Sequence, residues 1–279
     1  MSSPFLAAFF ALSAAAAWGS GDFTSGFVAR RIGSFRTVLI SYTVGLLALV
    51  IVALMRFEKL PPILDLVWGA LAGLSGMVGL GFLLRGFATG RMGIIAPVSA
   101  VLAAAIPVIF DTLTKGLPRE LQMLGFVVAL ISIWLLSRPE HLSGRPAGLG
   151  MALLAGLGFG GFFTMLGQVG SSAVFWPLAA GRLASCILMV TFAIFKRIPV
   201  KPPSSSLTLL TLGGLLDVGG NLFFLMAVQS GRLDVAAVLG SLYPAVTATL
   251  AWLISKEYMG RLQITGLAAA ILAIILITI

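Results

Sequence analysis

Residues 66–91 read LVWGALAGLSGMVGLGFLLRGFATGR, and residues 207–232, which stand 141 positions later, read LTLLTLGGLLDVGGNLFFLMAVQSGR. Each stretch contains an apolar run long enough to cross a bilayer as an α-helix, which takes roughly 20 residues. The same offset brings identical residues into register beyond these stretches. The identical pairs include Leu71 with Leu212, Gly73 with Gly214, Gly79 with Gly220, Phe82 with Phe223, Gly90 with Gly231, Arg91 with Arg232, Ala96 with Ala237, Lys115 with Lys256, Leu121 with Leu262, Gln122 with Gln263 and Gly125 with Gly266. The chain is therefore a duplication, with a first repeat over residues 1–141 and a second over residues 142–279.

Breaks at charged residues and at Pro and Gly clusters divide the apolar sequence into ten predicted transmembrane helices. They cover Phe5–Val28, Ser34–Met55, Leu66–Phe87, Gly93–Leu113, Leu121–Ser137, Gly148–Val169, Trp176–Phe195, Leu207–Gln229, Val235–Ser255 and Leu262–Ile279. Open strands cannot span hydrocarbon with unpaired backbone groups, and the runs lack the polar alternation of barrel strands. We predict an all-α integral membrane protein of ten transmembrane helices, five in each repeat.

Composition excludes several classes of protein. Hydrophobic residues make up 59% of the chain and charged residues 10%, far from the composition of a soluble domain. The net charge of +9 comes from Lys and Arg placed at the ends of apolar runs, so no basic face for nucleic acid is expected. Cys186 is the only cysteine, the only histidine is His141 in a loop, and no hydrolase or nucleotide-binding motif occurs. We therefore expect no metal, no cofactor and no enzyme activity.

The number of helices in each repeat sets how the repeats enter the membrane. Because five is odd, the second repeat is predicted to be inverted relative to the first, which is typical of transporters with a site at the bilayer midplane between the halves. Each half then supplies the other's inverted partner, so a monomer suffices, although the duplication does not forbid a dimer. The partners expected are a small-molecule substrate and the lipid bilayer.

The distribution of Lys and Arg suggests an orientation. Ten helices place both termini on one side, together with five basic residues, Arg56, Lys59, Lys115, Arg119 and Arg232. The opposite side holds twelve, namely Arg30, Arg31, Arg36, Arg85, Arg91, Arg138, Arg145, Lys196, Arg197, Lys201, Lys256 and Arg261. Cytoplasmic loops carry the excess of Lys and Arg, so this count places the termini outside.

Charged residues inside the predicted helices are candidate functional residues, because a charge at the bilayer centre costs at least ~2.5–3.5 kcal/mol. Asp22, Arg182, Asp217 and, less deeply, Arg85 meet this condition. Asp217 and Asn221 share one helix face, where a carboxylate and an amide can hold an ammonium group or a coupling proton. The alternative is a structural ion pair between Asp217 and Arg182, which lowers the insertion cost of both.

Four further features of the sequence bear on a site. Asp22 stands towards the far end of the first helix, so a position near the lipid headgroups is the alternative to a functional one. Trp18 and Tyr42 are the better candidates for a cavity lining, with membrane-interface anchoring as the alternative. Tyr243 precedes Pro244 in the ninth helix, where a break exposes backbone carbonyls to a transport path or forms a plain kink. Arg85 can instead extend its side chain to the nearby loop.

The second repeat ends in a recognisable pattern. Residues 241–257, SLYPAVTATLAWLISKE, followed by LQITG at residues 262–266, resemble the EamA-domain exporters of the drug/metabolite transporter superfamily. The first repeat has AAAWG at residues 15–19 and LQMLG at residues 121–125 in the corresponding places. It departs from the pattern where Ala103 and Gly116 align with Pro244 and Glu257. The resemblance covers essentially the whole chain.

The resemblance implies a secondary active transporter that works by alternating access and exports amino acids or related metabolites. It also implies cytoplasmic termini, against the Lys and Arg count, and a bacterial inner or plasma membrane is the expected location. With Asp217 and Asn221 holding an amine or a proton and Arg182 a carboxylate, a zwitterionic amino acid is the favoured substrate. The alternatives are a broad exporter of apolar or cationic compounds, and a non-transporting membrane protein such as a lipid-modifying enzyme or an assembly factor.

Overall fold

The computed structural model describes residues 4–88, 92–136, 149–170, 173–198, 200, 206–254 and 260–278. His141 and the end of the family pattern at residues 255–257 lie outside these ranges. The regular structure of the described residues is α-helical, apart from a single 3₁₀ residue at position 206. The helices are α1 (Pro4–Ile32), α2 (Ser34–Met55), α3 (Ile63–Ala88), α4 (Met92–Lys115), α5 (Glu120–Leu136), α6 (Leu149–Leu166), α7 (Phe175–Phe195), α8 (Leu207–Ser230), α9 (Leu233–Gly240), α10 (Tyr243–Ile254) and α11 (Arg261–Thr278).

Nine of the ten predicted helices each correspond to one observed helix, with shifted ends. The ninth prediction, Val235–Ser255, is wrong as a single helix, because the chain breaks between α9 and α10 at Ser241 and Leu242. Pro244 has no backbone N–H to continue the hydrogen-bond ladder, and it is well placed in the first turn of a new helix. A new helix, α10, therefore begins at Tyr243, directly after the break.

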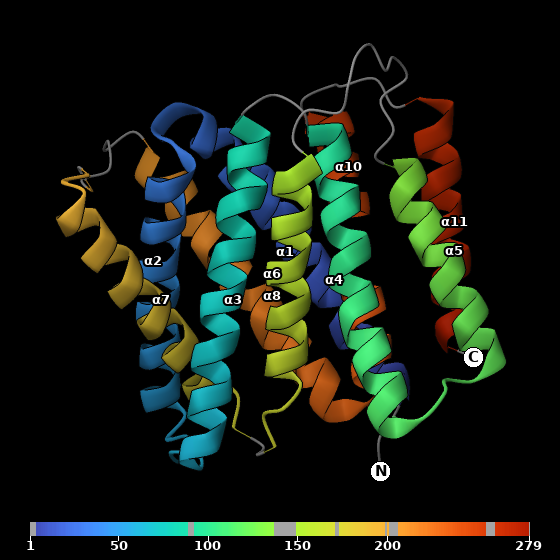
Figure 1. Cartoon of the computed structure of the whole chain (residues 1–279), viewed down its shortest axis with the longest axis horizontal. Helices are drawn as coiled ribbons and strands as arrows, with labels where there is room; N and C mark the ends of the chain where they lie inside the picture. The colour runs from blue at the N-terminus through green and yellow to red at the C-terminus, as the bar shows by residue number, and fades with distance from the viewer. Residues whose placement is uncertain are drawn as a thin grey trace.

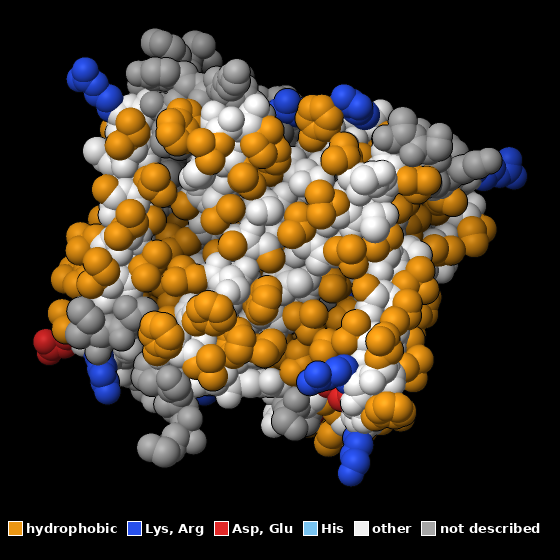
Figure 2. Space-filling model, turned by 180° about the vertical axis from the view of Figure 1, so that it is seen from behind, with side chains coloured by type: hydrophobic (Ala, Val, Ile, Leu, Met, Phe, Trp, Pro, Cys, Tyr) orange, Lys and Arg blue, Asp and Glu red, His pale blue; other side chains and the backbone are white. Residues whose placement is uncertain are grey.

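Six stretches of the described residues are long and apolar enough to cross a membrane: Phe5–Ile32, Ser34–Met55, Ile63–Gly86, Phe175–Lys196, Leu207–Ser230 and, taken together, Leu233–Ile254. Shorter apolar helices cover Glu120–Leu135, Gly150–Leu166 and Arg261–Ile277. Figure 2 shows an apolar band across the middle of one face, with Lys and Arg gathered towards its two ends. This distribution is that of a membrane protein.

Consecutive helices run in alternating directions, with α9 and α10 together acting as one rod, and both termini lie towards the same end of the bundle (Figure 1). We call this the termini end and the other the loop end.

Contacts between the two halves of the chain occur in matched pairs. The packing of α1 on α8 corresponds to that of α6 on α3, and the packing of α4 on α6 to that of α9 and α10 on α1. An approximate two-fold symmetry therefore relates the two halves.

Glycine brings α3 and α7 into backbone contact at the termini end. A Cβ added to Gly73 would overlap the backbone of Gly181, and one added to Gly69 would overlap that of Pro177. Gly69-x-x-x-Gly73 is thus a pair of small residues one helical turn apart that lets two helix backbones approach closely. Beyond this contact the two helices diverge towards the loop end, where α7 leans away from α3 (Figure 1).

Candidate functional site

A small cavity of about 40 Å³ lies at mid-depth, where α1, α2, α3, α6, α8 and α10 meet. Six of the seven residues predicted for the site from the sequence line it, namely Trp18, Asp22, Tyr42, Asp217, Asn221 and Tyr243. The seventh, Arg182, lines a smaller neighbouring cavity that shares Tyr42 and Asn221 with the first. The fold therefore gathers these residues around one space between the two repeats.

Arg182 of α7 is bound to Asp217 of α8. Its Nη2 donates a hydrogen bond to Asp217 Oδ2 in an ion pair, and its guanidinium carbon lies 3.8 Å from the centroid of the Tyr42 ring. The side chain of Arg182 is 3% exposed and that of Asp217 22%. The structural ion pair considered from the sequence is thus present, and this carboxylate holds Arg182 in the conformation observed. Nη1 of Arg182 has no hydrogen-bond partner among the described residues.

Asn221 forms a polar contact that joins the two halves. Trp18 Nε1 of α1 donates a hydrogen bond of 2.9 Å to Asn221 Oδ1 of α8, and both side chains are buried. This bond uses one of the two lone pairs of the amide oxygen, so Asn221 keeps a further acceptor site and the NH₂ group as a donor. The expected cooperation of Asp217 and Asn221 around an ammonium group stays a prediction; both line the cavity, and each also accepts a hydrogen bond from within the protein.

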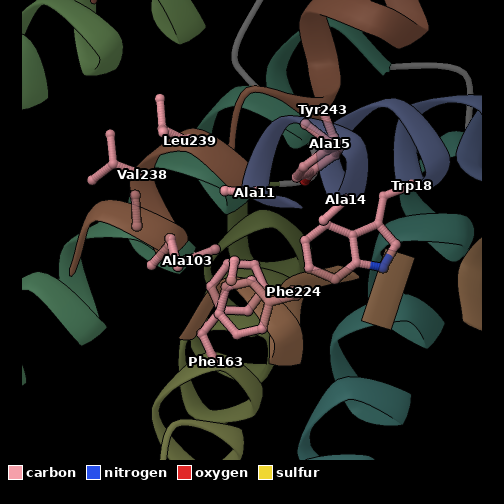
Figure 3. Close-up of a cluster of buried hydrophobic side chains, with 14 of the residues drawn as sticks. Ala11, Ala14, Ala15, Trp18, Ala103, Phe163, Phe224, Val238, Leu239 and Tyr243 are labelled. Atoms are coloured by element: carbon pink, nitrogen blue, oxygen red, sulfur yellow. The ribbon is translucent and has the colours of Figure 1, made fainter. Parts of the chain in front are cut away.

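Aromatic rings close the cavity on the side of the termini end. Trp18 stacks on Phe163 at a centroid distance of 5.4 Å and lies 5.6 Å from Phe224, while Phe163 and Phe224 stack at 4.5 Å (Figure 3). Phe162 adds a fourth ring, edge-on to Trp18. These rings come from three helices of both halves, so they form a rigid apolar floor.

Asp22 lies in the cavity, away from the helix end. Because α1 continues to Ile32, Asp22 stands one helical turn beyond Trp18 and well inside the span. Its side chain has no ion pair or hydrogen bond with any part of the chain that the structure describes. Since Asp217 is paired with Arg182, Asp22 is the acid that this cavity leaves without a positive partner.

Tyr243 closes the cavity from α10. The helix break places it at the start of α10, where its hydroxyl lies 3.5 Å from Ser99 Oγ of α4. Thr247, one turn further on, donates a hydrogen bond of 3.1 Å to the backbone carbonyl of Gly19 in α1. The break predicted from Pro244 thus joins the second repeat to two helices of the first.

Two acids that the sequence analysis did not single out tie the halves together at the termini end. Glu58, in the loop after α2, accepts hydrogen bonds of 2.8 to 3.2 Å from the backbone N–H groups of Val174, Phe175 and Trp176 at the start of α7. Asp65 of α3 accepts one of 3.0 Å from Gly170 N. A carboxylate near a helix N-terminus satisfies N–H groups that have no partner within the helix.

Two further acids accept hydrogen bonds from backbone N–H groups at the start of α9. Asp111, fully buried in α4, accepts a hydrogen bond of 3.2 Å from Asp234 N, and Asp234 accepts one of 2.8 Å from Val235 N. The hydrogen bonds from Arg232 to Asp234 raise the pKa of Arg232. A signal was available for Asp111, because it lies inside the predicted fourth helix and meets the same condition as Asp22.

Comparison with known proteins identifies the family. The model of the EamA-like transporter family matches the chain twice, over residues 5–138 and 146–279. The chain belongs to the EamA-like transporter family. The resemblance drawn from the sequence is therefore confirmed, and the protein is a multi-pass membrane protein of a transporter family.

Curated relatives of this EamA-family protein include YedA, named an uncharacterized inner membrane transporter, from Escherichia coli K12 and from E. coli O157:H7. Each is 25% identical in sequence, over 81% of this chain and 75% of the relative. A solved crystal structure matches the fold with a TM-score of 0.79, covering 98% of both chains at 16% identity. At that identity the match shows the fold alone.

Proposed function

We propose that this EamA-family protein is a secondary active transporter that carries a small amine-bearing metabolite through the central cavity by alternating access. In this proposal the protein has ten membrane-spanning segments, with α9 and α10 making one of them, arranged as two inverted five-helix repeats in a bacterial inner or plasma membrane. The cavity releases its cargo unchanged, so no reaction is assigned to it. The break between α9 and α10, beside a midplane cavity between two repeats, supports this mechanism.

The charge balance of the cavity carries the proposal. Asp22 and Asp217 bring two carboxylates and Arg182 brings one guanidinium, so one negative charge is left over. An ionised carboxylate at membrane depth is costly unless a proton or a cationic group neutralises it. A cavity with this balance favours an occupant with one positive charge, and protonation of Asp22 would compete with that occupant.

An amino acid is the favoured substrate within this class. Its ammonium group would pair with Asp22, and the apolar side chain would lie against the aromatic rings. Its carboxylate has a candidate partner in Nη1 of Arg182, a buried donor that lacks a hydrogen-bond partner among the described residues. For the carboxylate to reach Nη1, either Tyr42 must move or the ion pair between Arg182 and Asp217 must break. Asp22 is therefore the primary determinant of substrate binding in this proposal.

A broad exporter of cationic compounds is the second candidate. Asp22 and the aromatic lining suffice for a lipophilic cation without any contribution from Arg182, because ring faces attract cations. The two candidates differ only in whether a carboxylate on the substrate is recognised.

The test uses three matched ligands on purified protein: a neutral amino acid, the amine that lacks its carboxylate, and the acid that lacks its amino group. Binding is measured by thermal shift, since a ligand stabilises the state that it binds, and transport by counterflow in proteoliposomes. We expect the amino acid and the amine to bind, the acid to fail, and Asp22→Asn to abolish both responses. Glu120→Gln, which removes an exposed acid of α5, is the control and should leave binding unchanged.

The outcomes separate the candidates. An amine that binds as well as the amino acid favours the exporter of cationic compounds, whereas a preference for the amino acid favours recognition of the carboxylate. Binding and counterflow that persist in Asp22→Asn would contradict the role of Asp22. The absence of counterflow for every amine would contradict transport of this class.

A further inference from the structure

A second, larger space lies outside the central cavity, between α2, α3 and α7. It follows from the glycine contact described above, because α3 and α7 touch at Gly73 and Gly181 and then diverge towards the loop end (Figure 1). The resulting groove has a volume of about 530 Å³. We call it the α3–α7 groove.

The walls of the α3–α7 groove are almost wholly apolar and open to the outside of the bundle. They include Phe35 and Val38 of α2, Met77 and Phe82 of α3, and Leu188 and Phe192 of α7. Leu188 is 51% exposed and Phe192 47%, although these helices belong to the membrane-crossing set. Lipid is the medium that faces such a surface in a membrane protein.

One charged side chain lines this groove. Arg85, in the last turn of α3, lies at the loop end of the groove beside Ser34. The described acids lie either at the central cavity, as Asp22 and Asp217 do, or near the termini end, so no described carboxylate neutralises Arg85. The groove therefore combines an apolar slot with a guanidinium at its mouth that no carboxylate of the described residues neutralises.

We propose that the α3–α7 groove binds one anionic glycerophospholipid, with its phosphate on Arg85 and an acyl chain between α3 and α7. A guanidinium presents paired N–H donors that match a phosphate. Basic pockets between transmembrane helices are a recurring site for acidic lipid headgroups. The acyl chain fills space that the divergence of α3 and α7 leaves, so the lipid stabilises the divergent arrangement. This site is independent of the substrate proposed for the central cavity.

The test compares two lipids that differ in headgroup charge. Protein purified in neutral detergent is titrated with phosphatidylglycerol or phosphatidylcholine, and bound lipid is counted by native mass spectrometry while the unfolding temperature is followed. We expect one retained phosphatidylglycerol and a rise in unfolding temperature. Arg85→Gln should weaken this binding about tenfold or more, the cost of a lost charge-assisted hydrogen bond. Arg56→Gln, at the exposed termini end, is the control.

A second variant tests the apolar slot. A Cβ at Gly81, which lines the groove, would meet no atom within 4 Å, so Gly81→Leu extends into the groove and should displace the acyl chain without disturbing the helices. Equal retention of both lipids, or phosphatidylglycerol binding that survives Arg85→Gln or Gly81→Leu, would overturn the proposal. A stabilisation by glycerol phosphate as large as that by phosphatidylglycerol would also overturn it, because the site would then hold a free anion.

Discussion

At the scale of single residues, the cavity depends on which acid is paired and which is not. Asp22 and Asp217 have the same chemistry and line the same space, yet only Asp217 has a guanidinium beside it. The ion pair costs the desolvation of both charges and gains from their attraction and hydrogen bond. Its two members therefore depend strongly on each other.

Replacement of Arg182 alone should be more harmful than replacement of the pair. Arg182→Ala leaves the partly buried Asp217 without a counter-charge, which we expect to lower the free energy of unfolding by about 3 kcal/mol, the lower end of the cost of breaking a buried pair. The double variant Arg182→Met with Asp217→Leu removes both charges and keeps apolar volume, so it should recover most of that loss. Thermal unfolding in detergent measures both. A double variant as unstable as Arg182→Ala would show that the loss comes from packing against Tyr42.

At the scale of helices, two local features position the site: a helix break and a close contact between helices. The interruption before Pro244 sets Tyr243 against α4, and the glycine contact fixes where α3 and α7 cross. The first was expected from the sequence as a kink at Pro244. Neither pattern tells which helix lies opposite, because that depends on contacts between residues about a hundred positions apart.

A methyl group at the α3–α7 crossing should separate these helices. We expect Gly73→Ala to lower stability by about 1–3 kcal/mol, the usual cost of overpacking, because its Cβ would overlap backbone atoms of Gly181 that cannot move aside. Gly219→Ala is the matched control, since its Cβ would meet nothing within 4 Å, and it should be neutral or stabilising by up to about 1 kcal/mol. Thermal unfolding of both variants provides the comparison. Equal losses in the two would refute the steric argument.

At the scale of the whole molecule, the two ends of the bundle differ. The described acids outside the cavity gather towards the termini end, and Glu58 there joins the first repeat to the start of α7 in the second. Since alternating access requires each end to open in turn, this joint is one that a transport cycle would have to release.

Loss of the Glu58 carboxylate should loosen that end selectively. Glu58→Gln keeps the shape of the side chain but weakens its bonds to three N–H groups, with an expected loss of about 1–2 kcal/mol for a helix cap. Hydrogen exchange should accelerate at the amides of residues 174–176 and stay unchanged in α5. Glu120→Gln serves as the control. Unchanged protection at residues 174–176 would mean that the cap contributes nothing to holding this end closed.

Much of the fold and part of the site were predictable from the sequence. Apolar length and the 141-residue offset predicted the helices and the duplication, and the cost of intramembrane charge singled out Asp22, Arg182 and Asp217. The pairing within that set was left open, because it depends on how α7 and α8 each pack against α2. Glu58 was missed because it lies in a loop, where an acid is unremarkable until the partner N–H groups are known.

The matched packing of the two halves bears on how the protein is made. The most extensive helix contacts, such as those of α1 with α8 and of α5 with α11, join one half to the other, while neighbours within a half touch far less. A ribosome that has delivered the first five helices to the membrane has therefore produced almost none of the final interfaces. We therefore expect that neither repeat folds on its own and that the early helices remain loosely packed in the bilayer until their partners emerge.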